Sequence, residues 1–141
     1  MRCEEIMKRD IECLSPRDTV EAAALRMRDQ NIGFLPVCDT SGKVLGTLTD
    51  RDIVVRVLAG KKPTNTPVET IMTREVVSCR PQDGIERAEQ LMAQKHKSRI
   101  MCLDDSSRLV GIISLSDIAQ HVDGAHALET LRQVSEREVR A

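Results

Sequence analysis

Two short motifs with identical spacing carry the residues best suited to hold a small polar molecule. They read Gly46-x-x-Thr49-x-x-Asp52 and Gly111-x-x-Ser114-x-x-Asp117. Each hydroxyl residue ends an expected strand, beside the free amides of the next helix, which can bind a phosphate. Each aspartate falls in the first, exposed turn of that helix, where a carboxylate can accept both hydroxyls of a ribose. The alternative is that these side chains only cap the helix.

The elements that position these motifs come from an internal repeat. When the sequence is shifted by 65 positions, residues 3–57 align with residues 68–122 without a gap, and 15 of the 55 pairs are identical. The chain is therefore two copies of one unit. We expect a first repeat at 1–60, a linker at 61–67, a second repeat at 68–123 and a tail at 124–141.

Each copy has the pattern of a mixed α/β unit. A short strand is expected at 11–14 and at 76–79, and Asp18-x-x-Glu21 and Asp83-x-x-Glu86 match the capping box that opens a helix. Strand pairs are expected at 34–38 with 44–49 and at 100–103 with 109–114. A last helix follows each motif. The apolar stripes of the first helices are Val20, Ala23, Ala24 and Met27, and Ile85, Ala88 and Met92.

The order strand, helix, strand, strand, helix, closed by the paired motif, resembles a tandem pair of CBS domains, the Bateman module. The resemblance covers residues 3–122, and segments 31–39 and 48–53 look like the small stand-alone bacterial members. It implies an α/β fold in which two β-α-β-β-α repeats pack as a pseudo-twofold module, and the tail adds a C-terminal helix. It also implies an adenosine-containing ligand, such as AMP, ADP, ATP, an NAD-type molecule or S-adenosylmethionine, in the cleft between the repeats.

The resemblance assigns roles to particular residues. It places the ribose on Asp52 and Asp117 and the phosphate near Thr49 and Ser114. The adenine wall would be Cys13, Leu14, Ser15, Ile32, Leu35, Pro36 and Val37 in one half, and Ser78, Cys79, Arg80, Ile100, Met101 and Cys102 in the other. Further phosphate contacts would be Arg51, Lys97 and Arg99, with Ser116 counted among the ligand-binding residues. Plain core is the alternative for the apolar residues, and solvated surface charge is the alternative for the basic ones.

Two departures from the family pattern predict unequal sites. Met101 stands where the first copy has Pro36, and the basic residue that many relatives hold before this strand is replaced by Gly33 in one copy and Ser98 in the other. Phosphate binding is therefore in doubt in at least one of the two sites.

Composition narrows the class of protein. The 141 residues carry 21 basic and 22 acidic side chains, which argues against a nucleic-acid binder, and no apolar run is long enough for a membrane span. The N-terminus lacks a signal-peptide core, so the cytoplasm is expected. The five cysteines never form a C-x-x-C pair, so a disulfide framework and a metal site are not expected. Phe34 is the single aromatic residue.

The sequence favours a non-catalytic regulatory module over an enzyme or a ligand-free scaffold. It lacks a Ser/His/Asp set and a phosphate-binding P-loop, and Asp50 and Asp52 at a helix start point apart. The resemblance also implies that no cofactor is required and that the adenosyl ligand acts as an effector. The scaffold alternative rests on the departures at Gly33, Ser98 and Met101.

A homodimer is expected, together with an unidentified regulated protein. The tail places Ala125, Leu128, Leu131 and Val134 on one helical stripe that must dock on the module or on another subunit. The helices of the repeats add apolar residues that one module is too small to cover: Leu25, Met27, Val54, Leu58, Leu91, Met92 and Val122.

Overall fold

The computed structural model describes residues 1–121 and 123–140, which form two compact units. The first-repeat unit is Glu12–Val76, and the second-repeat unit combines Met1–Ile11 with Val77–Ala141. Each unit therefore contains the segment that precedes the other repeat in the sequence. The boundaries of the sequence repeats and of the structural units differ, because the first residues of each repeat pack in the unit of the other repeat. We call these two stretches, residues 1–11 and 68–76, the leading segments.

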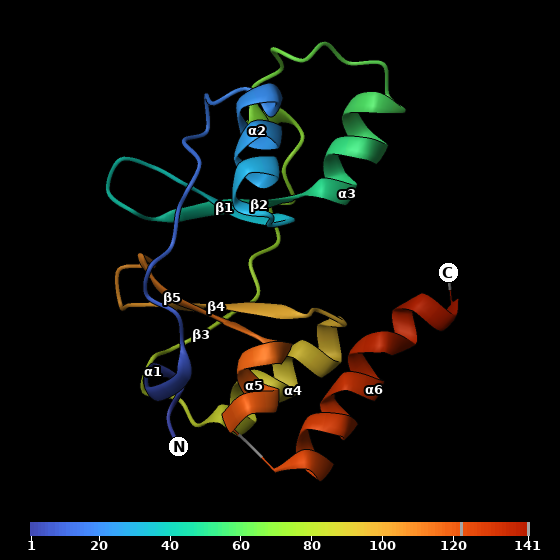
Figure 1. Ribbon diagram of the computed structural model, residues 1–141. Helices are drawn as coiled ribbons and strands as arrows, with labels where there is room; N and C mark the ends of the chain where they lie inside the picture. Colours follow the sequence, from blue (N-terminus) through green and yellow to red (C-terminus); the bar gives the residue numbers. More distant parts are fainter. Residues whose placement is uncertain (122, 141) are drawn as a thin grey trace. The chain divides into compact units, whose positions relative to one another are not determined.

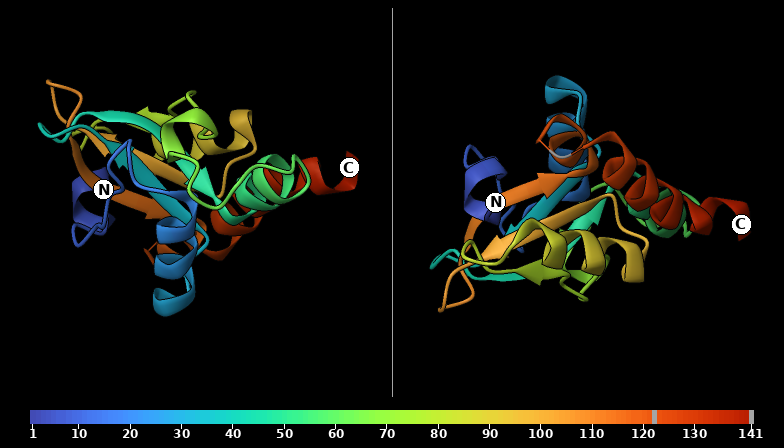
Figure 2. Two further views of the ribbon diagram at one scale, coloured as in Figure 1. Left: turned by 90° about the horizontal axis from the view of Figure 1, so that it is seen from above. Right: turned by 90° about the horizontal axis from the view of Figure 1, so that it is seen from below.

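The first-repeat unit is built on a two-stranded antiparallel sheet (Figures 1 and 2). Its elements are α2 (Val20–Gln30), β1 (Phe34–Cys38), β2 (Val44–Thr49), α3 (Asp50–Asp52), η1 (Ile53–Leu58) and η2 (Val68–Thr70). η1 is a π-helix and η2 a 3-10 helix. The core combines Leu14, Leu35, Val37, Leu48 and Val57 with the leading-segment residues Val68, Ile71 and Met72.

The second-repeat unit contains a three-stranded sheet with the order β3-β4-β5, and α4 and α5 cover one face of it (Figure 1). Its elements are α1 (Cys3–Ile6), β3 (Ser78–Cys79), α4 (Ile85–Lys95), β4 (Arg99–Leu103), β5 (Leu109–Ser114), α5 (Leu115–His121) and α6 (Gly124–Arg140). The expected C-terminal helix is thus confirmed. It packs on α4 and α5 and buries Val134 there. Leu128, Leu131 and Ala125 stay exposed, so the predicted apolar stripe is only partly covered.

Local predictions at the strand and helix starts need correction. Residues 11–14 form no strand, and only Leu14 pairs with Val37. The expected capping boxes are shifted: Thr19 caps α2 by accepting from the Ala22 amide, and α4 begins after Gly84 without a side-chain cap. Asp18 and Asp83 instead accept from the amides three residues earlier and close the turns that precede these helices. Ala24, expected in the buried stripe of α2, is exposed.

Each leading segment pairs with the strand that carries the motif glycine. Lys8 bridges Ile112 next to Gly111, and Thr73 bridges Thr47 next to Gly46. A Cβ atom on Gly111 would lie 2.3 Å from Sδ and 2.9 Å from Cβ of Met7, and one on Gly46 would lie 2.6 Å from the carbonyl oxygen of Thr73. The motif glycines are therefore required for close packing of the leading segments.

We expect Gly111→Ala to lower the free energy of unfolding by about 1–3 kcal/mol, because the added methyl group overpacks against Met7. Urea unfolding measures the change. Gly124→Ala is the matched control, since a Cβ atom there meets nothing within 4 Å. Equal unfolding midpoints for the two variants would contradict the packing explanation.

Candidate functional site

In the first-repeat unit, the motif closes on itself at the junction of β2 and α3. Thr49 Oγ1 accepts from the Asp52 amide at 3.1 Å, and Asp52 Oδ2 accepts from the Thr49 amide at 3.0 Å. This reciprocal pair is a capping box. The prediction that the hydroxyl stands beside free amides is therefore wrong here, because the hydroxyl occupies one of them.

The second-repeat unit repeats the arrangement at the start of α5. Asp117 Oδ2 accepts from the Ser114 amide at 2.8 Å and from the Ser114 hydroxyl at 3.0 Å. Ser114 Oγ in turn accepts from the Asp117 amide at 3.2 Å. The capping role that the sequence left as an alternative is thus real in both units. A ligand role would have to use the other carboxylate oxygen.

The free carboxylate oxygens have different surroundings. Asp52 Oδ1 lies 3.8 Å from Arg56 Nη2 in a half-buried position. Asp117 Oδ1 lies 3.6 Å from Lys8 Nζ, and Asp117 is only 4% exposed. The prediction of an exposed first turn is wrong for Asp117, because the leading segment that carries Lys8 belongs to the same unit.

The wall residues of the first-repeat unit lie along β1. The Leu14 amide donates to the Pro36 carbonyl at 2.8 Å, and the Cys38 amide donates to the Leu14 carbonyl at 2.9 Å. The residues predicted for this wall separate by burial: Leu14, Leu35, Pro36 and Val37 are buried, Cys13 and Ile32 are half-buried, and Ser15 is exposed. The buried ones form core. Cys13, Ser15 and Ile32 are the wall candidates that a ligand could reach.

In the second-repeat unit, β3 lies parallel to β4 and pairs Ser78 with Met101. The predicted residues again separate: Cys79, Ile100, Met101 and Cys102 are buried, Ser78 is half-buried, and Arg80, Lys97, Arg99 and Ser116 are exposed. Arg80 Nη1 lies 2.7 Å from Asp105 Oδ1. In the first-repeat unit, Arg51 is exposed at the position equivalent to Ser116.

Three buried thiols meet in the core of the second-repeat unit. Cys79 Sγ lies 3.7 Å from Cys3 Sγ and 3.6 Å from Cys102 Sγ. The repeat places Val68, Leu14 and Val37 at the equivalent positions of the other core. The thiols therefore fill positions that are aliphatic in the sister repeat, as small hydrophobic side chains. Within 1–121 and 123–140, no group of three His, Cys, Asp or Glu residues could hold a metal ion.

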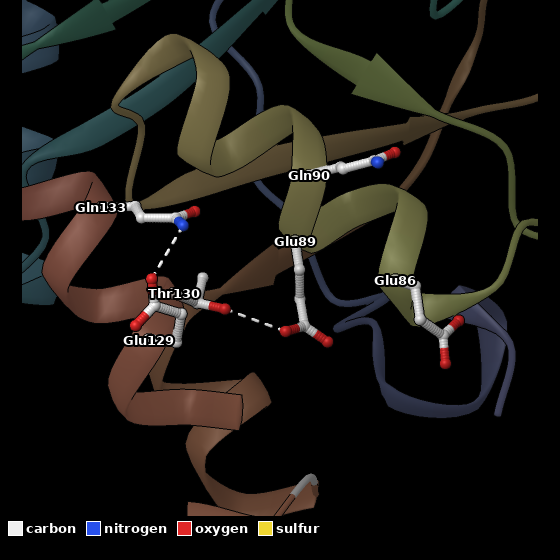
Figure 3. A pocket seen from close by; sticks show the side chains of 6 residues that line it. All are labelled: Glu86, Glu89, Gln90, Glu129, Thr130 and Gln133. Atoms are coloured by element: carbon white, nitrogen blue, oxygen red, sulfur yellow. Dashed lines mark hydrogen bonds between the residues drawn. The ribbon is translucent and has the colours of Figure 1, made fainter. Parts of the chain in front are cut away.

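A hollow of about 300 Å³ lies between α4 and α6 (Figure 3). It is lined by Glu86, Glu89, Gln90, Glu129, Thr130 and Gln133. The buried Glu89 accepts from the Thr130 hydroxyl at 2.9 Å, and Gln133 Nε2 donates to Glu129 at 2.9 Å. Three carboxylates make this lining unsuitable for a phosphate, and four of its six residues bind one another in pairs.

Sequence reasoning missed Asp50, Lys8 and Arg56, which set the charge around the motifs. From the sequence alone, Asp50 stands out only as half of a possible acid pair with Asp52. A comparison of the repeats could have singled it out, because its equivalent is the apolar Leu115. The part played by Lys8 could not be read from the repeat, since it depends on the leading segment's move to the other unit.

The comparisons with known proteins identify the family. The model of the CBS domain matches residues 3–59 and 68–124, and the chain belongs to this family as a tandem CBS pair. The CBS domain-containing protein YhcV of Bacillus subtilis is 40% identical over 116 residues, which cover 82% of this chain and 81% of that protein. No helix among the described residues is long and apolar enough to cross a membrane.

Two solved structures have the same fold. The CBS domain pair of protein MJ0100 in complex with 5′-methylthioadenosine and S-adenosyl-L-methionine has a TM-score of 0.76 and 28% identity, covering 85% of this chain and 98% of that one. Hypoxic Response Protein I with two coordinated zinc ions has a TM-score of 0.78 and 31% identity, covering 87% of this chain and all of that one. The predicted resemblance and fold class are confirmed.

We predict that Cys13 is the first cysteine to react with iodoacetamide. The other four are buried, whereas Cys13 is half-buried, and a hydrogen bond from the Cys38 thiol, supported by Arg26, lowers the pKa of Cys13 to about 7. Since the thiolate is the nucleophile, the rate should rise with pH and reach half its plateau near that value. Mass spectrometry of tryptic peptides locates the label, and Cys13→Ser is the control. Earlier labelling of Cys79 or Cys102 would contradict the prediction.

Proposed function

We propose that this CBS pair is a non-catalytic regulatory module that binds an adenosine-containing ligand at the Thr/Ser-x-x-Asp motifs. One observation carries the proposal: Asp52 uses Oδ2 for the helix cap, whereas Oδ1 lies outside the cap, 3.8 Å from Arg56 Nη2, which is beyond hydrogen-bond distance. A carboxylate oxygen with free lone pairs can accept from ribose hydroxyls. The MJ0100 pair in complex with two adenosyl compounds supports this class of ligand.

The proposed first-repeat site combines Asp52 with the accessible wall residues Cys13, Ser15 and Ile32. Thr49 stands at the end of the site where a 5′ substituent of the ligand would lie, and the exposed Arg51 follows on the same helix start. The second-repeat site would use Asp117, Ser114, Ser116, Ser78, Lys97 and Arg99. Because Asp117 is only 4% exposed and its Oδ1 lies 3.6 Å from Lys8 Nζ, whereas Asp52 is half-buried, the first site is the better candidate.

A ligand-free scaffold is the second candidate function. It is favoured by the closed hydrogen bonding of both motifs, in which hydroxyls and amides bind one another. The two functions differ in one measurable property, which is heat released on mixing with adenosyl compounds.

We expect calorimetry to show binding of adenosine, 5′-methylthioadenosine or S-adenosylmethionine. Asp52→Ala should weaken adenosine binding by about 10- to 100-fold, because a hydrogen bond to a charged acceptor contributes about 1.5–3 kcal/mol. Thr49→Ala is the matched control: it removes the other hydrogen bond of the capping box, from the Asp52 amide, but leaves the carboxylate on the Thr49 amide. Because adenosine carries no phosphate for the Thr49 hydroxyl to bind, its affinity should stay within about threefold, which is under 1 kcal/mol.

Wild-type affinity in Asp52→Ala would refute the ribose assignment. Bound ligand should also protect Cys13 from iodoacetamide, which reports on the wall without a mutation at the motif. Chromatography of the recovered ligand should show that it is chemically unchanged. If the ligand were converted to a product, and Asp52→Ala abolished the conversion, the protein would be an enzyme and the proposal of a non-catalytic module would be wrong.

We also propose that the protein is a homodimer that pairs through the exposed helix face of the first-repeat unit. Leu25 on α2 and Val54, Val55 and Leu58 on η1 are exposed, Leu58 by 75%. The expected apolar surface is smaller than the sequence suggested: Met27 and Met92 are buried, Leu91 is half-buried, and Val122 lies outside the described residues. Soluble monomers rarely leave a large apolar surface uncovered, and a second copy of this helix face would cover these side chains.

Light scattering at micromolar concentration should therefore give about twice the chain mass of 15.7 kDa. Leu58→Glu should shift the mass toward one chain, because isologous pairing places this charge in the interface twice. Lys61→Glu, an exposed change just beyond η1, is the control. A monomeric wild-type protein, with or without nucleotide, would refute the dimer.

A further inference from the structure

The carboxylate of Asp50 lies directly over the backbone of Gly33. A Cβ atom on Gly33 would be 2.8 Å from Asp50 Oδ2 and 3.3 Å from Oδ1, and the Asp50 amide donates to the Gly33 carbonyl at 3.1 Å. The missing side chain at position 33 thus admits an acidic group next to Thr49. Asp50 is exposed, and no residue in 1–121 or 123–140 forms a salt bridge with it.

The amides at this helix start are all used within the chain. The Asp50 amide binds Gly33, the Arg51 amide donates to Asp50 Oδ1 at 2.8 Å, and the Asp52 amide donates to Thr49 Oγ1. The Ile53 amide donates to the Asp50 carbonyl. A helix start attracts anions through such amides when they are free. Here they are occupied, and Asp50 and Asp52 add two negative charges.

The second-repeat unit keeps the backbone and changes the charge. The Leu115 amide donates to the Ser98 carbonyl at 3.0 Å, which is the equivalent of the bond from the Asp50 amide to the Gly33 carbonyl. Leu115, however, has no carboxylate that could accept from the amide of Ser116. Lys97 precedes β4 and Arg99 begins it, and the first repeat has Ile32 and Phe34 at these two positions. The two motifs therefore share a geometry and differ in electrostatic potential.

We infer that Asp50 is a specificity-determining residue, which makes the first-repeat site select adenosyl ligands without a 5′-phosphate over nucleotides. The inference rests on the proposed function. With the ribose on Asp52 and the 5′ end near Thr49, a 5′-phosphate would approach a helix start whose amides are already bonded and which carries the two carboxylates of Asp50 and Asp52. Like charges at such close range repel even in water. Neutral adenosine and 5′-methylthioadenosine, and cationic S-adenosylmethionine, meet no such penalty.

The exposed Arg51 is the cation nearest in sequence that could offset this repulsion. Neighbouring residues on a helix point in different directions, so Arg51 does not share the face of Asp50. Arg56 is already turned toward Asp52 and donates to the Ile71 carbonyl at 2.8 Å. The charge of Asp50 therefore dominates at the position that follows Thr49.

The test compares adenosine and AMP by calorimetry on the full chain and on Asp50→Asn. The asparagine keeps the shape and an acceptor for the Arg51 amide and removes the charge. We expect AMP affinity to rise by about tenfold, in line with the energy of like charges near a protein surface, while adenosine affinity stays within about twofold. Asp29→Asn removes the same charge from an exposed position on α2 and should change neither affinity.

The gain in AMP affinity should disappear when Asp52→Ala is added to Asp50→Asn, which assigns it to the first-repeat site. If adenosine binds but the ratio of the two affinities is the same in the wild type and in Asp50→Asn, the specificity inference is wrong and the proposed function stands. If neither compound binds the wild type or Asp50→Asn, the proposed function is wrong, and the specificity inference, which rests on it, is wrong as well.

Discussion

The pairing of each motif-bearing strand with a leading segment from the other half of the sequence is the constraint on which the structure depends. Lys8 and Ile112 exchange two backbone hydrogen bonds of 2.9 and 3.0 Å, and Thr47 and Thr73 exchange two of 2.9 Å. This pairing occupies an edge that would otherwise expose unpaired amides and carbonyls. It requires Gly46 and Gly111, brings Lys8 to Asp117, and completes both cores. The fixed strand end then determines where each motif can open its helix.

The Thr/Ser-x-x-Asp motif serves the helix first and a ligand second. Its hydroxyl and one carboxylate oxygen close the cap in both units, which holds the aspartate in one orientation. A side chain fixed in this way loses less conformational freedom when it accepts a further hydrogen bond. The capping and binding interpretations of the motif, which compete when only the sequence is considered, are therefore compatible, because they use different oxygens of the same carboxylate.

The sequence predicted the repeat, the family, the strand pairs and the C-terminal helix, because these follow from periodicity and from paired motifs. It failed where packing between distant segments decides. Asp117 is buried in a unit that also holds the leading segment with Lys8, and Pro36 and Met101 are buried on strands that pair with Leu14 and with β3. The helix caps were misplaced by one residue, since Asp18 closes a turn and leaves the cap to Thr19. Local pattern cannot distinguish two acceptors that are adjacent in the chain.

The exchange of leading segments bears on how such a chain could have arisen. A single ancestral repeat, translated alone, would have had no second half to supply its strand edge, and a second molecule could have provided the missing segment. Two identical polypeptides swapping their first residues would satisfy both edges, which is the arrangement known as domain swapping. Tandem duplication of the gene would then turn an exchange between molecules into one within a molecule. On this view the sequence repeat, whose second copy begins near residue 68, and the folded unit, whose boundaries lie near residues 11 and 76, are different units of the same chain.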